Sequence, residues 1–362
     1  MDITDFVKAT GNEFATVAED GITAGDVAGW IDTGSYAMNA LLSGSIYKGA
    51  PSNKILGIGA DPKTGKTFIA LSILKGFLAS HPDSIGLVFE TESALTKETL
   101  VDRGIDVKRV GIIPVTTAQE FRNQALKVVA NYEKLKEKDR KPICLILDSL
   151  GMLSTTKEMA DSEAGSDTKD MTRAQLLKAA FRVLTLRLGR ANIPLYVTNH
   201  VYDDVGGGPY ASKVQGGGSG LIYAASTILT FSKAKEKTSD GEITGVIITV
   251  TAGMSRFTRE GLKVKIRLKF DGGLDRYYGL LEIAEAAKIF KKVSTKYEFA
   301  DGSKVFGSQI IKNPEKYFTK EVLDQIDEYT QRVFTYKGHS NGDAEYDATM
   351  DEEVHSEGSS EE

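Results

Sequence analysis

One octet near the start of the chain carries residues with a clear chemical purpose. Residues 60–67 read A-D-P-K-T-G-K-T and lie between a short apolar run at 54–59 and a stretch of helical apolar spacing at 68–80. A Gly/Lys/Thr turn between a strand and a helix is typical of the phosphate-binding P-loop, whose backbone N–H groups and helix N-terminus attract a polyphosphate. We therefore predict that Lys66 binds the β- and γ-phosphates of ATP and that Thr67 ligates Mg²⁺.

Ala60 departs from the usual motif, which begins with Gly, and a simple glycine-containing turn between strand and helix is the alternative interpretation. The complete octet in this context favours nucleotide binding. The predicted nucleotide-binding residues are Ala60, Asp61, Pro62, Lys63, Thr64, Gly65, Lys66 and Thr67, together with Asp148.

Two acidic residues follow later apolar runs. Glu92 comes just after the run at 84–90, and Asp148 lies at the end of the run P-I-C-L-I-L-D-S at 142–149. The carboxyl ends of parallel strands form the ligand-binding edge of an open sheet, so both carboxylates are expected near the P-loop. We predict that Glu92 activates the water that attacks the γ-phosphate and that Asp148 holds Mg²⁺ through water. For Glu92, the alternative is an acid that stabilises a helix N-terminus.

A polar segment at 151–170 follows one core strand and precedes a helix predicted at 170–190. We expect the segment to be a loop at the ligand edge of the sheet. The helix carries five basic residues, which are Arg173, Lys178, Arg182, Arg187 and Arg190. A basic helix behind a loop fits contact with a phosphate backbone, and a solvated helix face is the alternative. The predicted DNA-binding residues of this region are Lys157, Lys169 and Arg173.

A second such segment, at 201–220, contains two Gly triplets and therefore a permissive backbone. Its tyrosines and lysine can stack on bases and pair with phosphates. The predicted DNA contacts are Tyr202, Tyr210, Lys213, Gly216, Gly217 and Gly218. Just before the segment, His200 can hydrogen-bond the γ-phosphate and report its presence to the loop, although a lone histidine can also be purely structural.

The composition is that of an ordinary globular protein. The chain has 362 residues, of which 41% are hydrophobic and 26% are charged, enough for one large α/β domain and a smaller one. The single cysteine, Cys144, lies in an apolar run, which argues against a disulfide framework. The N-terminus has no signal-peptide pattern and no stretch is long enough to span a membrane, so we expect a cytoplasmic protein.

The charge is unevenly distributed along the chain. The net charge is −5, but the segment 338–362 contains nine acidic residues and no Lys or Arg, so the body of the chain is mildly basic. A segment so poor in apolar residues cannot bury enough surface to fold. We expect it to be a disordered acidic tail.

The alternation of apolar runs and amphipathic stretches predicts an α/β fold with a mostly parallel central sheet flanked by helices. Amphipathic helices at 280–292 and 318–334 predict a small C-terminal subdomain. The predicted organisation is an N-terminal oligomerisation segment at 1–29, an ATPase core at 30–275, the small subdomain at 276–337 and the tail at 338–362. For the first segment, the alternative is a helix that packs on its own domain.

Several strings, in this order, resemble the phage UvsX branch of the RecA strand-exchange recombinases over about 31–293. The most specific are L-D-S-L-G (147–151), D-M-T-R-A (170–174), N-I-P (192–194), T-N-H (198–200), G-G-G-S-G (216–220) and K-F-D-G-G-L-D (269–275). The resemblance implies a RecA-like P-loop core that uses ATP and Mg²⁺. It also implies that 151–170 and 201–220 are the two DNA-binding loops of the family.

The same resemblance implies roles for individual positions. Glu92 falls on the catalytic glutamate of the family, and His200 falls on its γ-phosphate sensor, which is Gln in bacterial RecA. Arg256 and Met254 fall where bacterial RecA has two lysines that reach ATP on the adjacent subunit. Because Met254 cannot donate to phosphate, Arg256 is the expected catalytic cation from the neighbour, beside Lys66, Glu92 and His200 of the subunit that binds ATP.

Together these features predict an ATP-dependent DNA recombinase that forms helical filaments on single-stranded DNA and exchanges strands with homologous duplex DNA. The context would be phage recombination, repair and replication, with single-strand-binding and loader proteins as further partners. A hexameric DNA helicase with a RecA core is the alternative enzyme. A DNA-binding mediator that uses ATP only as a switch is the non-catalytic alternative.

Overall fold

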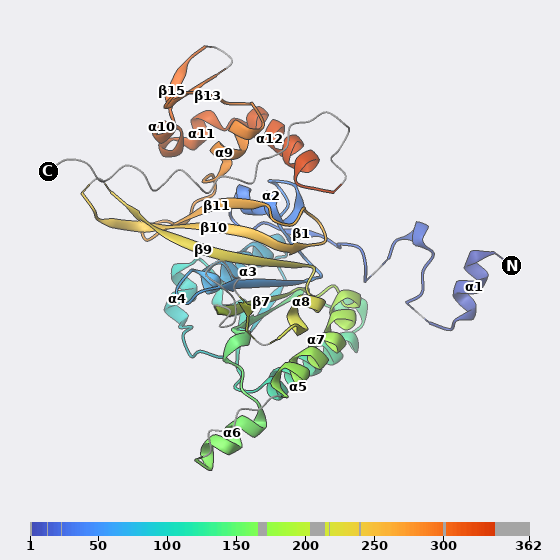
Figure 1. Cartoon of the computed structure of the whole chain (residues 1–362). Helices are drawn as coiled ribbons and strands as arrows, with labels where there is room; N and C mark the ends of the chain where they lie inside the picture. The colour runs from blue at the N-terminus through green and yellow to red at the C-terminus, as the bar shows by residue number, and fades with distance from the viewer. Residues whose placement is uncertain are drawn as a thin grey trace.

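The computed structural model describes residues 2–12, 14–22, 24–165, 172–202, 214–216, 218–238, 240–299 and 302–336. Its centre is a ten-stranded sheet (Figure 1). The strands lie in the order β12 (Gly273–Leu274), β11 (Lys263–Lys269), β10 (Ile243–Ser255), β9 (Thr227–Lys237), β3 (Ile55–Ala60), β7 (Leu195–Tyr202), β6 (Ile143–Asp148), β4 (Ile85–Glu90) and β5 (Val110–Pro114). The tenth strand, β8 (Val214–Gln215), pairs with the end of β7.

The strands from β9 to β5 pair in parallel, and β10, β11 and β12 continue the sheet in antiparallel pairing. The predicted α/β fold with a mostly parallel sheet is therefore confirmed. The register brings the carboxyl ends of four strands to one edge. Ala60 pairs with His200, and Glu90 pairs with Asp148.

The parallel strands are apolar along their length because helices cover both faces of the sheet. Every residue of β3 and of β6 is buried. Along β6, Cys144 and Ile146 belong to one hydrophobic cluster, whereas Ile143, Leu145 and Leu147 belong to the other. This alternation is the period of two that places successive side chains on opposite faces of a strand.

The helices divide between the two faces of the sheet. The first cluster contains residues of α2 (Tyr36–Ser43), α3 (Lys66–Ser80) and α4 (Lys97–Asp102). The second contains residues of α5 (Ala118–Glu133), α7 (Arg173–Arg190) and α8 (Gly220–Ala224). The start of α5 is fixed by a capping box, in which Thr117 and Glu120 satisfy each other's backbone N–H groups.

The prediction of a continuous loop at 151–168 is wrong at its centre. Residues Thr156–Glu163 form a helix, α6, which projects from the body of the protein and buries none of its residues (Figure 1). Thr155 and Glu158 form a capping box at its start, a T-x-x-E signal that is visible in the sequence. Local capping therefore makes this polar segment helical without tertiary packing.

The C-terminal region contains more strand than predicted. The helix expected at 280–292 ends early, as α9 (Leu280–Ala286), because Lys288 adopts a left-handed backbone conformation with φ of 59°. A three-stranded sheet follows, made of β13 (Lys291–Val293), β14 (Lys296–Glu298) and β15 (Lys304–Phe306). The remaining helices are α10 (Gly307–Lys312), α11 (Pro314–Tyr317) and α12 (Lys320–Val333). Their apolar residues share the first cluster with α2 and α3, so this region is part of the main core.

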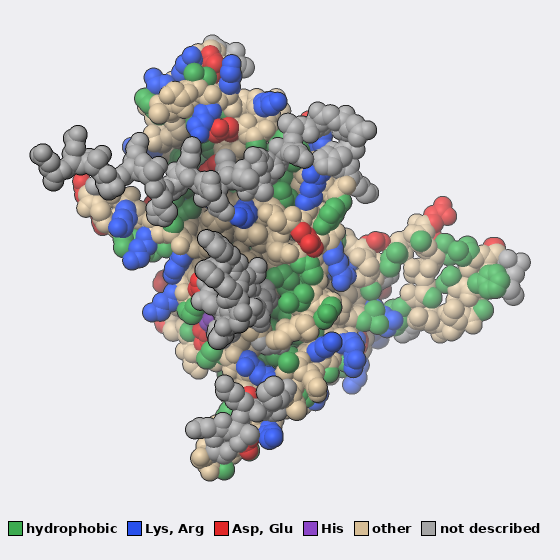
Figure 2. All heavy atoms as spheres, in the orientation of Figure 1, with side chains coloured by type: hydrophobic (Ala, Val, Ile, Leu, Met, Phe, Trp, Pro, Cys, Tyr) green, Lys and Arg blue, Asp and Glu red, His purple; other side chains and the backbone are tan. Residues whose placement is uncertain are grey.

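The N-terminal segment extends away from the body (Figure 1). Its helix, α1 (Ile3–Ala9), has no buried residue, and Ile3 and Phe6 are 65% and 62% exposed. Figure 2 shows hydrophobic side chains gathered along this segment. The chain joins the core at a short antiparallel pair, β1 (Trp30–Ile31) with β2 (Ala50–Pro51). Within the described residues, no helix combines the length and apolar character needed to cross a membrane.

Candidate nucleotide-binding site

The octet at 60–67 connects β3 to α3 at the carboxyl edge of the sheet. Lys63 and Gly65 have positive φ values of 59° and 101°, and a side chain on Gly65 would lie 3.2 Å from Ile248. Helix α3 starts at Lys66 without a side-chain cap and without an acid in its first turn. Its N-terminal N–H groups and positive dipole end are therefore available for an anion.

The side chain of Lys66 is buried at the head of this loop. Its Nζ donates hydrogen bonds to the carbonyl oxygens of Ala60 (3.2 Å) and Asp61 (3.1 Å) and lies 3.4 Å from Nδ1 of His200. Burial lowers the pKa of Lys66, while the nearby carboxylates of Glu92 and Asp148 oppose this effect. The loop thus places the Lys66 ammonium where the phosphates of a bound triphosphate could take over the hydrogen bonds that it now makes to the two carbonyl oxygens.

A carboxylate and a hydroxyl lie together beside Lys66. Thr198 donates a hydrogen bond to Asp148, and Thr67 also hydrogen-bonds this carboxylate. Burial raises the pKa of Asp148, and these two hydrogen bonds partly oppose the rise. Mg²⁺ takes oxygen ligands and favours one or two carboxylates together with substrate phosphates. The pair of Thr67 and Asp148 fits this cation.

Glu92 lies at the same edge, above the end of β6. Its Oε1 accepts a hydrogen bond from Ser149 Oγ at 2.7 Å and lies 3.2 Å from His200 Nε2. The Glu92 side chain is 34% exposed, against 14% for His200, so water can reach the carboxylate. His200 therefore bridges Lys66 on one side and Glu92 on the other.

Sequence reasoning gave no role to Glu90, which fixes the turn that carries Glu92. The Glu90 carboxylate accepts hydrogen bonds from the backbone N–H groups of Glu92, Ser93 and Ala94, at 2.8 to 3.2 Å. Lys233 was also missed, because it comes from distant β9. Its Nζ donates to the carbonyl oxygen of Lys63 at 2.5 Å and so braces the P-loop.

Both candidate DNA-binding segments begin against His200. On one side, a side chain on Gly151 would lie 3.1 Å from the His200 ring, so only glycine fits there without displacement. On the other side, the Gly216 N–H donates to the His200 carbonyl at 3.0 Å, and the Asn199 amide donates to the Gly216 carbonyl at 2.8 Å. The start of the first segment and the Gly216 end of the second thus meet at His200, which the second segment directly follows in the chain.

The predicted DNA-binding residues differ in their surroundings. Arg173, at the start of α7, donates to the Gly151 carbonyl at 2.6 Å and so ties the helix to the first segment. Lys157 lies exposed on α6. Gly218 packs closely against α7, since a side chain there would lie 2.8 Å from Ala174. Four further predicted residues, Lys169, Tyr210, Lys213 and Gly217, lie outside the described residues. Tyr202 is described only in its backbone.

The basic helix α7 is only partly a solvated face. Arg187 forms an ion pair with Glu133 of α5, and the guanidinium of Arg190 stacks 4.0 Å from the ring of Phe14. Lys178 lies 5.2 Å from the ring of Tyr223. Lys178, Arg187 and Arg190 therefore have partners within their own chain, which favours a structural role for these three charges.

Arg256 lies away from the other predicted catalytic residues. Its backbone N–H donates to the carbonyl of Ser226, which precedes β9, and its charge lowers the pKa of Lys54 after the larger effect of burial. Lys54 precedes β3, whereas Lys66 follows it, so Arg256 is at the amino edge of the sheet. It does not meet the P-loop of its own chain.

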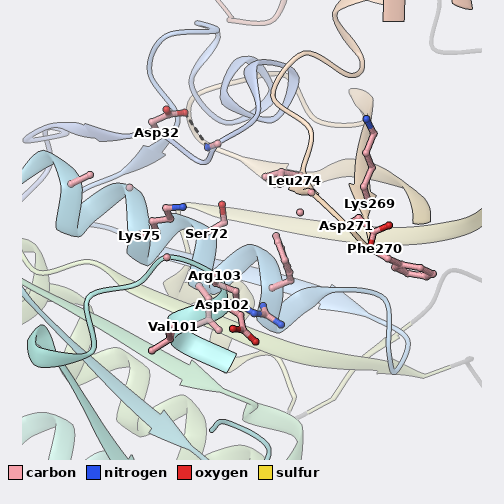
Figure 3. A pocket seen from close by; sticks show the side chains of 18 residues that line it. Asp32, Ser72, Lys75, Val101, Asp102, Arg103, Lys269, Phe270, Asp271 and Leu274 are labelled. Carbon is pink, nitrogen blue, oxygen red and sulfur yellow. Dashed lines mark hydrogen bonds between the residues drawn. The ribbon is translucent and has the colours of Figure 1, made fainter. Parts of the chain in front are cut away.

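A cavity of about 850 Å³ opens beside the P-loop helix (Figure 3). Its walls come from α3, from the end of α4 and from the turn between β11 and β12. Phe68, which directly follows Thr67, and Arg103 both line it. Neither residue was predicted to be functional, because their contact joins two helices far apart in the sequence.

Comparison with known proteins gives the same picture as the site. No protein-family model matches the chain. A recombination and repair protein of Enterobacteria phage T4 is 31% identical over 248 residues, which are 68% of this chain and 61% of the T4 protein. The chain thus spans about three fifths of that relative. RecA of Thermus thermophilus is 24% identical over 322 residues, 86% of this chain and 89% of RecA.

RecA of Treponema denticola is 25% identical over 254 residues, 70% of this chain and 58% of that protein. These similarities agree with the P-loop, with the parallel sheet and with the ordered motifs of the sequence. These relatives confirm the resemblance to the phage UvsX branch of the RecA recombinases.

Proposed function

We propose that the protein is an ATP-dependent DNA recombinase, which forms helical filaments on single-stranded DNA and pairs them with homologous duplex DNA. The observation that carries this proposal is the hydrogen-bonded chain from Lys66 through His200 to Glu92. It joins the P-loop to the residue against which both candidate DNA-binding segments begin. A bound nucleotide would therefore be linked to the DNA-binding segments through a short series of direct contacts.

The chemistry follows from the positions of the side chains. Lys66 and the N-terminal N–H groups of α3 bind the phosphates, and Glu92 accepts the proton of the attacking water. Ser149 and His200 orient the Glu92 carboxylate for this step. Mg²⁺ held by Thr67 and Asp148 would neutralise the negative charge that develops on the phosphates.

His200 also acts as the nucleotide sensor in this proposal. A γ-phosphate at the Lys66 ammonium offers His200 a new acceptor in place of its present contacts. Gly151 packs against the imidazole, and the Gly216 N–H donates to the backbone carbonyl of His200, so a shift of this residue would reach both segments. Such local contacts order a binding segment while the phosphate is present and release it after hydrolysis.

The site is completed by the neighbouring subunit in the filament. Arg256, at the amino edge of one sheet, would reach the ATP at the carboxyl edge of the next and act as an arginine finger. The exposed apolar residues of α1 would dock on an adjacent subunit, which gives the head-to-tail contacts that a helical filament requires. Single-strand-binding and loader proteins are the further partners proposed, while the acidic tail lies outside the described residues.

ATP hydrolysis measured with and without single-stranded DNA tests the proposal. We expect strong stimulation by single-stranded DNA, together with filaments in electron micrographs when a non-hydrolysable ATP analogue is added. A rate indifferent to DNA would contradict the proposal. Unwinding of a forked duplex by ring-shaped particles would instead indicate a hexameric helicase.

A further inference from the structure

The cavity beside α3 has the character of a site for an uncharged, flat group. Phe68, Leu71, Phe270 and Leu274 supply apolar walls. Its volume of about 850 Å³ lies within the usual range for small-molecule sites. Its charged lining residues are three acids, Asp32, Asp102 and Asp271, and three bases, Lys75, Arg103 and Lys269, so the lining carries no net positive charge that would select phosphates. The cavity therefore suits the nucleoside end of a nucleotide better than its phosphate end.

The position of the cavity relative to the P-loop supports the same assignment. Glu92, His200 and Asp148 mark the γ-phosphate end of the site, because they surround the Lys66 ammonium. Phe68 is the next residue after Thr67 and forms part of the cavity wall. A triphosphate with its γ end at Lys66 can therefore extend past the start of α3 into this cavity.

Arg103 is the cavity residue with unused hydrogen-bonding capacity. Its guanidinium carbon lies 4.5 Å from the centre of the Phe68 ring, and Phe68 is in turn packed under Gly273. Its Nη1 is buried and makes no hydrogen bond to any residue that the structure describes. Leaving a buried charged donor unpaired is costly, whereas a ligand acceptor would satisfy it.

We propose that Arg103, held flat on Phe68, contacts the adenine base of ATP and determines how tightly the nucleoside end is bound. A guanidinium stacks on aromatic faces and donates in a fixed fork, so it can pair with the ring nitrogens of a purine while Phe68 supports it. The amino group of adenine would find an acceptor in Asp102 or Asp271. This inference rests on the proposed function, since it assumes that ATP occupies the P-loop.

Binding measurements without DNA test the assignment. The affinity for a fluorescent ATP analogue, and competition by ATP and by inorganic triphosphate, are measured with Mg²⁺ present for four proteins. These are the unsubstituted chain, Arg103→Met, Arg103→Lys and the control Lys97→Met. Lys97 is an exposed cation at the start of the same helix and does not line the cavity.

We expect Arg103→Met to weaken ATP binding roughly tenfold or more while inorganic triphosphate binds as before, because only the base contact is lost. Arg103→Lys should be intermediate, since it keeps the charge without the planar fork. The control should be unchanged, and thermal unfolding shows whether each variant is folded. If Arg103→Met and its control bind ATP equally, the proposal is overturned.

Two further outcomes keep this proposal separate from the proposed function. An equal loss of affinity for ATP and for triphosphate would assign Arg103 to the phosphates and overturn the base contact. If Arg103→Met unfolds, Phe68→Leu is measured instead. It removes the ring on which Arg103 stacks, so it should weaken the binding of ATP but not that of inorganic triphosphate. An unsubstituted chain that binds neither compound would contradict the proposed function itself.

Discussion

The two edges of the central sheet differ in how their charges are arranged. At the carboxyl edge, Lys66, His200 and Glu92 contact one another within a single chain. At the amino edge, Arg256 lies near Lys54, a second cation, which binds backbone carbonyls of the N-terminal segment. The carboxyl edge thus resembles an assembled site, whereas at the amino edge Arg256 forms no ion pair with any residue that the structure describes. The comparison suggests that a complete site forms only where the carboxyl edge of one subunit meets the amino edge of the next.

The largest effect is expected from the carboxyl edge itself. Glu92→Gln removes the base but keeps the size of the side chain, so ATP turnover should fall by at least about a hundredfold. Filaments on single-stranded DNA should persist, because the phosphate-binding residues remain. Phosphate release and electron microscopy measure the two properties, with Glu98→Gln, at an exposed position of α4, as the control. If the Glu92→Gln variant hydrolyses ATP as fast as the unsubstituted chain, Glu92 is not the catalytic base.

The next effect tests the amino edge. Arg256→Ala should lower DNA-stimulated turnover by roughly a hundredfold or more without changing ATP binding by a free subunit. Mixing this variant with Glu92→Gln should restore activity, because about a quarter of random interfaces then combine an intact Glu92 with an intact Arg256. A mixture as inactive as its two components would show that Arg256 does not act across subunits.

A smaller effect concerns the link between the carboxyl edge and DNA. His200→Ala should reduce the ATP-dependent gain in affinity for single-stranded DNA by roughly tenfold, whereas affinity without nucleotide stays constant. His200→Gln should retain most of the gain, because Gln can also hydrogen-bond both neighbours. Fluorescence anisotropy with a labelled oligonucleotide measures the gain. An unchanged gain in the Ala variant would leave His200 a structural residue.

The smallest effect concerns the stability of the carboxyl edge. The pKa of Asp148 is raised in the folded protein by burial, so ionisation of this group lowers the free energy of unfolding as the pH rises above the ordinary Asp pKa. Without Mg²⁺ and nucleotide, Asp148→Asn should therefore raise the Tm at neutral pH on the order of 2 °C. The gain should disappear in acid, and a gain independent of pH would contradict the explanation. Asp102→Asn, an exposed acid on α4, is the control.

The carboxyl edge was predictable because its residues follow strands that the apolar runs reveal. A parallel sheet brings the ends of such strands together, so Lys66, Glu92, Asp148 and His200 had to be neighbours. The position of Arg256 was not predictable from spacing, since β10 runs antiparallel and returns the chain to the opposite edge. Only the family resemblance pointed to it.

Other features escaped sequence reasoning for local or long-range reasons. The helix α6 was missed although its capping box is visible, because the polar composition of the segment was given more weight. The short strands β13 to β15 lack a strong alternating pattern and depend on their packing. Arg103 and Phe68 meet through tertiary structure alone, so neither residue carries a signal in the sequence.

The contacts of α12 and Phe334 with the first part of the chain have a consequence for how this protein folds during synthesis. Phe334 is fully buried in the same cluster as α2 and α3, and its carbonyl accepts a hydrogen bond from the N–H of Arg259. Asp327 likewise receives hydrogen bonds from Ser45 and Ile46, nearly three hundred positions earlier. During synthesis, the first third of the chain can therefore complete its hydrophobic core only after α12 has left the ribosome. A nascent chain arrested before this helix would expose apolar surface and be a substrate for chaperones.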